Sequence, residues 1–217
     1  FGSEEIELMP VDGHGRMRAD ALAGALAGAT GPIIVCAQAG NVATGASDPI
    51  GAIADLAHAC GAWVHVDGAF GLWAAAVPEL RAQVARVETA DSWTTDAHKW
   101  LNVPYDSGVA IVRDAAPHRA AMSMFASYLL RGGEEQRVGM DWVPESSRRA
   151  RVLALYALFR ALGRDGIREL ILRTCALARR MAERLSTAPG ITILNDVVLN
   201  QVLVQFRDDE TTRGVIA

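Results

Sequence analysis

The chain has 217 residues, of which 51% are hydrophobic and 21% are charged, the composition of a globular protein with a core. This excludes a disordered chain, a collagen-like repeat and a small disulfide scaffold. The net charge of −4 argues against a nucleic-acid partner and against a polybasic membrane surface. The cysteines Cys36, Cys60 and Cys175 are odd in number and far apart, which predicts reduced thiols in a cytoplasmic protein.

Both ends of the chain suggest that it is incomplete. It begins at Phe1 without a starting Met or a signal-peptide pattern, and it stops at Ala217 just after a charged turn. Residues 21–40 carry no charge and have about the length of a membrane span. They are mostly Ala and Gly and are interrupted at Thr30-Gly31-Pro32, which favours two short elements joined by a turn. We therefore expect no membrane partner.

Strand and helix patterns alternate over the first 115 residues. Short strands are predicted at 4–8, 33–37, 62–66, 92–95 and 109–112, of which 33–37 and 62–66 are apolar. Helices are predicted at 18–27, from Pro49 to about Gly61 and from Pro78 to about Val87. Asp48 is the predicted N-cap of the second helix, with Pro49 at its first position. Buried strands that alternate with helices predict an α/β fold, a mostly parallel sheet covered by helices on both faces. In such a sheet the ligand lies beyond the carboxyl ends of the strands.

The pattern changes after about residue 140. Two amphipathic helices are predicted at 148–162 and 166–185, followed by strands at 191–194 and 201–206. This order indicates the start of a smaller α+β domain, so we divide the chain into residues 1–140 and 141–217. The polar, Gly-containing segment 127–144 is predicted to be a loop.

The candidate chemistry begins with one lysine. The chain contains 20 arginines and a single lysine, Lys99, and only lysine can act as a nucleophilic amine. Lys99 follows one predicted strand, and Asp67 ends another, so the two can converge on one crevice. An amine that attacks an aldehyde, beside an acid that holds a protonated ring nitrogen, describes a pyridoxal phosphate (PLP) site.

Two other interpretations compete with this one. Lys99 could be a surface lysine that survived by chance. His65 and His98 could bind a metal together with Asp67, because residues i and i+2 share a strand face, but the sequence shows no third cluster of ligands, and we predict no metal site.

The order of these motifs is family-specific. His65-Val66-Asp67-Gly68-Ala69, then Ala90-Asp91-Ser92, then Asp96-Ala97-His98-Lys99-Trp100-Leu101 resembles the group II PLP-dependent amino-acid decarboxylases, members of the fold type I, aspartate-aminotransferase-like superfamily. The resemblance extends from Gly40-Asn41 to Phe206. It implies that residues 1–140 are the C-terminal part of the large PLP-binding domain. Residues 141–217 would then be the interdomain helix and part of the small domain.

The resemblance also implies roles for individual residues. Lys99 would form the Schiff base with PLP and move protons, Asp67 would pair with the ring nitrogen, and His98 would assist at the catalytic centre. The remaining implied cofactor contacts are Ala69 on one ring face, His98 and Ser92 at the phosphate, Asn41 where many relatives have Thr, and His65 as support for Asp67. Asp96 is left out of the cofactor contacts, because an acid is a poor match for a phosphate dianion.

The implied function is removal of the α-carboxylate of an L-amino acid by a cytoplasmic homodimer whose active sites lie at its interface. The family's phosphate loop and its ring-stacking aromatic residue precede the part of the family that this chain resembles. The tyrosine that the aromatic-amino-acid enzymes use to protonate Cα has no counterpart here. An aminotransferase, a carbon–carbon lyase of the same fold type, and a cofactor-free fragment with a structural role therefore remain as alternatives. The substrate is not identified.

Overall fold

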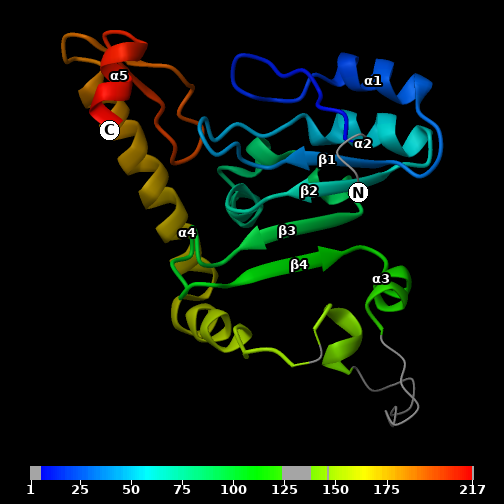
Figure 1. The fold of residues 1–217 in the computed structure, drawn as a ribbon. Coiled ribbons are helices and arrows are strands. Elements are labelled where there is room, and N and C mark those ends of the chain that lie inside the picture. Colours follow the sequence, from blue (N-terminus) through cyan, green and yellow to red (C-terminus); the bar gives the residue numbers. More distant parts are fainter. Residues whose placement is uncertain (1–5, 124–137, 146, 217) are drawn as a thin grey trace.

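The computed structural model describes residues 6–123, 138–145 and 147–216. Its main element is a four-stranded sheet in the order β1-β2-β3-β4 (Figure 1). The strands are β1 (Ile34–Gln38), β2 (Trp63–Asp67), β3 (Ser92–Asp96) and β4 (Gly108–Val112). The first three are parallel and β4 is antiparallel to β3. The predicted α/β class with a mostly parallel sheet is confirmed.

The helices of this region follow the prediction in part. α1 (Ala19–Gly28) and α2 (Ile50–Ala59) lie where helices were expected. The helix predicted from Pro78 to Val87 is wrong: the β2–β3 connection is made of the short 3-10 helices η2 (Gly71–Ala76), η3 (Arg81–Val84) and η4 (Val87–Thr89). Arg86 adopts a φ of 60°, in the left-handed region, and this interrupts any continuous helix there.

The start of α2 also differs from the prediction. The helix begins at Ile50, Pro49 is its N-cap residue, and Asp48 makes no cap. The Asp48 carboxylate instead accepts hydrogen bonds from the main-chain N–H groups of Met17 and Gln38, each at 2.6 Å. The two donors are 31 and 10 residues away from Asp48 in the sequence. Both carboxylate oxygens are therefore engaged in tertiary hydrogen bonds, and neither caps α2.

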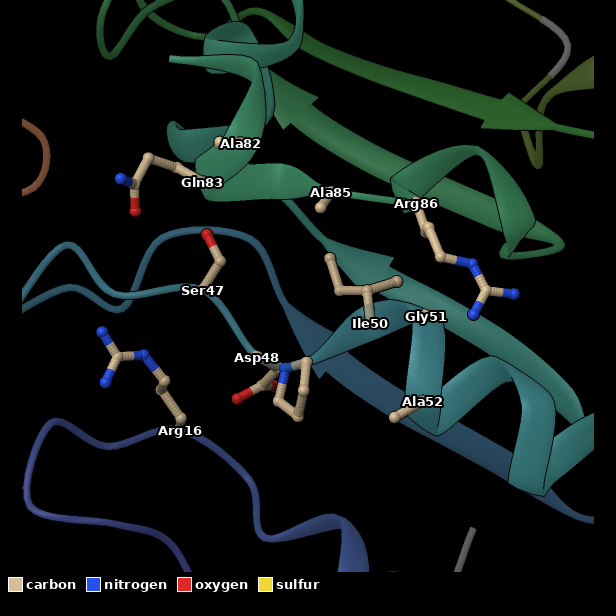
Figure 2. Close-up of a pocket in the computed structure, with 11 residues that line it drawn as sticks. Arg16, Ser47, Asp48, Ile50, Gly51, Ala52, Ala82, Gln83, Ala85 and Arg86 are labelled. Atoms are coloured by element: carbon tan, nitrogen blue, oxygen red, sulfur yellow. The ribbon is translucent and has the colours of Figure 1, made fainter.

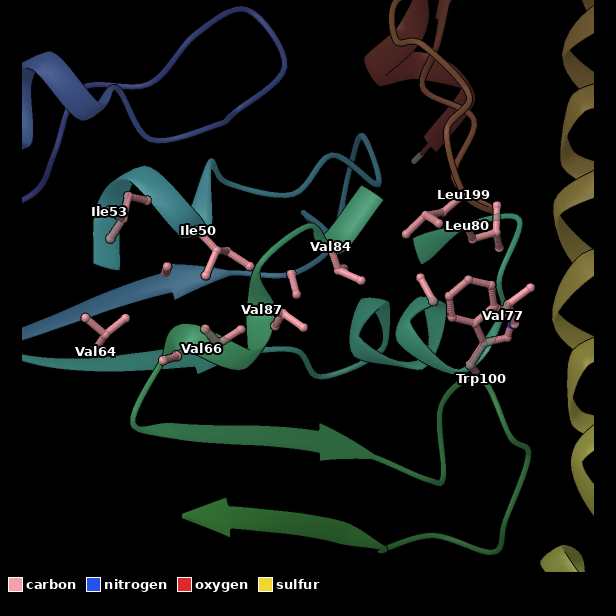
Figure 3. Close-up of a cluster of buried hydrophobic side chains, with 14 of the residues drawn as sticks. Ile50, Ile53, Val64, Val66, Val77, Leu80, Val84, Val87, Trp100 and Leu199 are labelled. Carbon is pink, nitrogen blue, oxygen red and sulfur yellow. The ribbon is translucent and has the colours of Figure 1, made fainter. Parts of the chain in front are cut away.

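The core lies on one face of the sheet. Side chains alternate along β1 and β2, so Val35, Val64 and Val66 are buried while their neighbours point to the opposite face. Ile50 and Ile53 of α2 pack over this buried face (Figure 3). The fully buried Val and Ile side chains each stabilise the fold by about 1.5–3 kcal/mol relative to exposure.

The opposite face carries polar and exposed side chains. Its members on the first three strands are Ile34, Cys36 and Gln38 of β1, Trp63, His65 and Asp67 of β2, and Ser92, Thr94 and Asp96 of β3. Ile34 is 53% exposed. Among the described residues, helices therefore cover one face of the sheet, and the carboxyl-terminal part of the other face is open.

The C-terminal part is joined to the sheet by α4 (Val152–Leu185), which passes the edge where β1, β2 and β3 end (Figure 1). Gly163 has φ 62° and ψ −169° and divides α4 at the position where two separate helices were predicted. The indole N–H of Trp100, just after Lys99, donates to Thr174 Oγ1 of α4 at 2.8 Å. α4 is therefore fixed to the residue that follows the lysine.

Beyond α4 a second sheet forms from β5 (Ile191–Ile193) and β6 (Val204–Phe206), followed by α5 (Asp209–Ile216). The two strands were predicted and α5 was not. Leu199 and Asn195 tie this part back to the main sheet region, since Leu199 joins the core and Asn195 Nδ2 donates to the Thr44 carbonyl at 2.9 Å. The boundary at residue 140 stays a prediction.

The remaining elements are α3 (Ala115–Met122) and the 3-10 helix η5 (Gly139–Trp142). Most of the loop predicted at 127–144 lies outside the described residues, and its last part contains η5. The strand predicted at 4–8 is absent at residues 6–8, and its first two positions are outside the described residues. In the described part of the chain, no helix combines the length and the apolar character that crossing a membrane requires.

Candidate functional site

Lys99 lies at the carboxyl end of β3, and its amine is held by an acid. Lys99 Nζ is 3.0 Å from Asp96 Oδ2, and the lysine side chain remains 47% exposed. Asp96 is the last residue of β3, three positions before the lysine. The ion pair therefore fixes the amine over the end of the strand while leaving it accessible to a small molecule.

Asp67 ends the neighbouring parallel strand on the same face. Asp67 pairs with Thr94 of β3, whose side chain lies on the same face of the sheet as that of Asp96. The two strand ends are joined further by the main chain, because Asp96 N donates to the Ala69 carbonyl at 2.7 Å. The structure thus places Asp67 and Lys99 at adjacent strand ends, while their convergence on one cofactor stays a prediction.

The Asp67 carboxylate is partly free. Oδ1 accepts a hydrogen bond from the Ala69 main-chain N–H at 3.0 Å, and Oδ2 has no hydrogen-bond partner among the described residues. Gly68 permits this tight turn, because a Cβ there would lie 2.5 Å from Leu72 Cβ. Burial, together with the nearby charge of Asp67, raises the pKa of the Cys36 thiol on the adjacent strand. Because Oδ2 has no partner among the described residues, the Asp67 carboxylate is available to a ligand whose protonated nitrogen donates a hydrogen bond.

His98 is fixed by the loop that follows Lys99. Its Nδ1 lies 3.0 Å from Ser107 N and 3.1 Å from Ser107 O, contacts that require opposite roles of the nitrogen, so one is made at a time. Its ring also packs on Tyr105 with centroids 4.4 Å apart. Its other nitrogen, Nε2, is 3.9 Å from Asp96 Oδ2. His98, Lys99 and Asp96 therefore form one cluster.

His65 and Ser92 form a separate contact further back on the sheet. Ser92 begins β3, and its hydroxyl interacts with Trp63 Nε1 and with His65 Nδ1, both at 2.8 Å. His65 Nε2 is 3.4 Å from Thr94 Oγ1. Burial lowers the pKa of His65, although the charge of Asp67 opposes this. His65 lies two residues before Asp67 on the same face of β2, and its role as a support for Asp67 stays a prediction. The structure does not bring Ser92 to the strand end where Lys99 lies.

Asn41 shapes the loop after β1. Its Oδ1 accepts from the main-chain N–H groups of Ala43 and Thr44 at 3.0 and 3.2 Å. Next to it, a Cβ on Gly40 would lie 2.9 Å from Gly71 Cα, so this loop packs directly on the segment after Asp67. Asn41 is thus at the correct edge of the sheet, with its oxygen engaged in its own turn.

Sequence reasoning missed two parts of this arrangement. Asp96 was set aside, although its spacing of three residues before Lys99 was a sufficient signal for an ion pair. Ser107 and Tyr105, which hold His98, carry no local signal. They reach the histidine only because β4 returns antiparallel to β3 and pairs Gly108 with Asp96. Arg151 Nε and Asp106 Oδ1, 2.7 Å apart, link this loop to the residue that precedes α4.

The metal alternative finds no geometric support in residues 6–123, 138–145 and 147–216. No three His, Cys, Asp or Glu side chains there converge on a point that could hold an ion. His65 and His98 make the separate contacts described above. The donor set of an amine, a free carboxylate oxygen and an imidazole instead fits an organic cofactor that has an aldehyde, a protonated ring nitrogen and an anionic group.

Comparison with known proteins places this geometry in a family. Residues 2–208 match the family model described as the pyridoxal-dependent decarboxylase conserved domain. L-2,4-diaminobutyrate decarboxylase of Rhizobium meliloti is 33% identical over 95% of this chain and 43% of its own length. Phenylacetaldehyde synthase of Arabidopsis thaliana is 30% identical over 82% of this chain and 38% of its own length.

A solved structure agrees with this assignment. The Oryza sativa protein TDC, crystallised with PLP and tryptamine, aligns with a TM-score of 0.83 and 28% identity over 95% of this chain and 43% of its own. The chain therefore spans less than half the length of these relatives. Because the family model covers nearly all of the sequence, the chain belongs to the pyridoxal-dependent decarboxylase family.

Proposed function

We propose that this chain is part of a PLP-dependent enzyme that removes the α-carboxylate of an L-amino acid. The observation that carries the proposal is the position of Lys99. The only lysine of the sequence has its amine 3.0 Å from Asp96, at the sheet edge and on the open face where the neighbouring strand ends in Asp67. Family membership and the PLP-bound rice relative support the same cofactor.

Each of the clustered residues has a task that follows from its chemistry. Lys99 would hold the cofactor's aldehyde carbon through its amine and return a proton to the substrate carbon at the end of the reaction. When bound, PLP supplies an electron-accepting ring that stabilises the negative charge left by the departing carbon dioxide. Asp67 would keep the ring nitrogen protonated through its free Oδ2, because an opposite charge at contact distance favours the protonated form.

The surrounding residues would complete this half of the site. His98 would present Nε2 toward the phosphate side, and Ala69 would pack on one face of the ring. His65 would support Asp67 from behind, and Asn41 would border the site from the loop after β1. Ser92 stays a prediction as a phosphate contact, and its two bonds, to Trp63 and His65, favour a role in fixing the imidazole.

Attachment of the cofactor can be tested directly by finding the residue that carries it. PLP added to the complete protein should produce a visible absorbance band. Borohydride reduction and peptide mass mapping should then place the added mass on the peptide that contains Lys99. Lys99→Arg keeps the positive charge but lacks the nucleophilic amine, so it should give neither the band nor the label. Unlabelled Lys99 in the complete protein would contradict the proposal.

The reaction itself needs a second measurement. Incubation with a panel of amino acids should release carbon dioxide and the corresponding amine. Asp67→Asn should lower that rate by about 100-fold, corresponding to roughly 3 kcal/mol of lost charge stabilisation. Production of keto acids without carbon dioxide would replace decarboxylation by transamination.

The finer properties of the protein are part of the same proposal. A homodimer with active sites at its interface is carried over from the family resemblance, and sedimentation of the complete protein at several concentrations tests it. A cytoplasmic location is supported by three cysteines that are all free thiols in the structure. Fractionation of cells that produce the protein checks this location.

A further inference from the structure

A cavity of about 430 Å³ that is widely open to solvent lies at the N-terminal end of α2 (Figure 2). Its walls come from the chain that enters α2, the first turn of that helix and the connection around η3. α2 packs on the buried face of the sheet, whereas Asp67 and Asp96 are on the open face. The cavity is therefore separate from the site around Lys99, and its volume suits a small organic molecule.

Ser47 provides the first sign that this cavity binds a ligand. The residue is 8% exposed, and its buried hydroxyl has no hydrogen-bond partner among the described residues. Figure 2 shows the hydroxyl projecting from the chain before α2 toward the Ala82–Gln83 side of the cavity. A buried hydroxyl without a partner is unfavourable in the free protein, and a ligand that accepts its hydrogen would remove that cost.

The helix terminus supplies further donors beside Ser47. Pro49 has no side-chain oxygen that could cap α2, and the carboxylate of Asp48 is bonded elsewhere. The main-chain N–H groups of Gly51 and Ala52 have no hydrogen-bond partner among the described residues. Such N–H groups point out of the helix terminus, where the helix dipole favours negative charge.

The charges around the cavity limit how much negative charge a ligand can carry. Arg16 is 3.3 Å from Asp12. Arg86 makes two bonds to Asp55, at 2.7 and 2.8 Å, so both guanidinium groups are already neutralised. Asp48 adds a further carboxyl group to the wall, and burial raises its pKa. A dianion such as phosphate would therefore meet unfavourable charge, whereas a single carboxylate is matched by the neutral N–H and O–H donors.

The rest of the wall is mainly apolar, apart from the amide of Gln83. The ring of Pro49, the side chain of Ile50 and the methyl groups of Ala82 and Ala85 line it. We infer that this cavity binds a small organic monocarboxylate. Its carboxylate accepts hydrogen bonds from Ser47 and from the first turn of α2, and its short carbon chain lies on the apolar wall.

Butyrate is a suitable probe, and calorimetric titration of the complete protein should show saturable binding. Ser47→Ala should weaken this binding about tenfold, because it removes one hydrogen bond to a charged group. It should not lower the melting temperature, since the lost hydroxyl has no partner in the free protein. Ser186→Ala, at the far end of α4, is the matched control and should bind as the wild type does. Ala85→Leu fills the cavity from an exposed position and should abolish binding.

Hydrogen exchange gives an independent readout at the helix. Butyrate should slow exchange in the peptide that contains residues 50–53, and butylammonium, which has the same carbon chain with the opposite charge, should not. Lack of butyrate binding to the wild type overturns the inference. Binding of butyrate by Ser47→Ala and by Ala85→Leu with the affinity of the wild type also overturns it. Tighter binding of inorganic phosphate than of butyrate would show that the ligand class is wrong.

Discussion

Replacement of Asp48 by alanine tests how strongly one carboxylate organises the loop that precedes α2. Its two oxygens accept the main-chain N–H groups of Met17 and Gln38, both at 2.6 Å, and the residue is 8% exposed. A hydrogen bond to a charged group contributes about 1.5–3 kcal/mol, so the pair contributes about 3–6 kcal/mol. Burial raises the pKa of Asp48 in spite of both bonds, so desolvation of the charged carboxylate offsets much of this gain. The loss expected on removing the side chain then comes from the two buried N–H groups that are left without an acceptor.

We therefore expect Asp48→Ala to lower the free energy of unfolding by about 3 kcal/mol. Urea unfolding followed by circular dichroism measures this difference. Asp48→Asn keeps one acceptor and should lose about half as much, while Asp165→Ala, on the exposed side of α4, should change stability by less than about 0.5 kcal/mol. A loss below about 1 kcal/mol for Asp48→Ala would refute the reasoning that these two bonds hold the loop.

Two further predictions concern stability. Burial favours a higher pKa for Asp91, but hydrogen bonds from the Val64 main chain and the His58 imidazole outweigh burial. The pKa of Asp91 is therefore held below its ordinary value. The carboxylate therefore stabilises the fold above about pH 4, and this contribution is lost as the pH falls further. Asp91→Asn should cost about 1 kcal/mol at pH 7 and progressively less as the pH falls below about 4, and a loss that does not shrink on acidification in urea titrations would contradict this. A Cβ at Gly71 would lie 2.2 Å from the Ala39 carbonyl oxygen, so Gly71→Ala should destabilise by about 1–3 kcal/mol in thermal unfolding. Gly24→Ala, with open space around it, should be neutral or stabilising, and equal melting temperatures for the two variants would show that the close approach is unimportant.

Local patterns along the sequence were sufficient for the strands of the main sheet and for the order of the reactive residues. The short runs that end in Asp67 and just before Lys99 have the length of strands, the first of them apolar, and parallel strands bring their carboxyl ends to one edge. The chemistry of a single lysine beside an acid then indicated an aldehyde cofactor. These inferences needed no long-range contact, because each depends on residues that are close in sequence.

Other features depended on contacts between distant segments. The buried side chains Val77, Leu80, Val84 and Val87 between β2 and β3 recur at helical spacing, so the pattern predicted one helix. The chain instead forms separate 3-10 turns there, with Arg86 in the left-handed region. Asp48 was expected to cap α2, but its carboxylate oxygens instead accept hydrogen bonds from the main-chain N–H groups of Met17 and Gln38.

The detailed surroundings of the site were also decided by tertiary structure. Lys99 was predicted from its chemistry, whereas the Ser107 contacts that hold His98 arise only when β4 folds back along β3. Ser92 shows the converse: its motif placed it at the cofactor, but the alternation and length of β3 place its hydroxyl between Trp63 and His65. Sequence determined which groups can react, because reactivity belongs to the side chain. The fold alone decided which groups meet, because hydrogen bonds and packing join residues that are far apart in the chain.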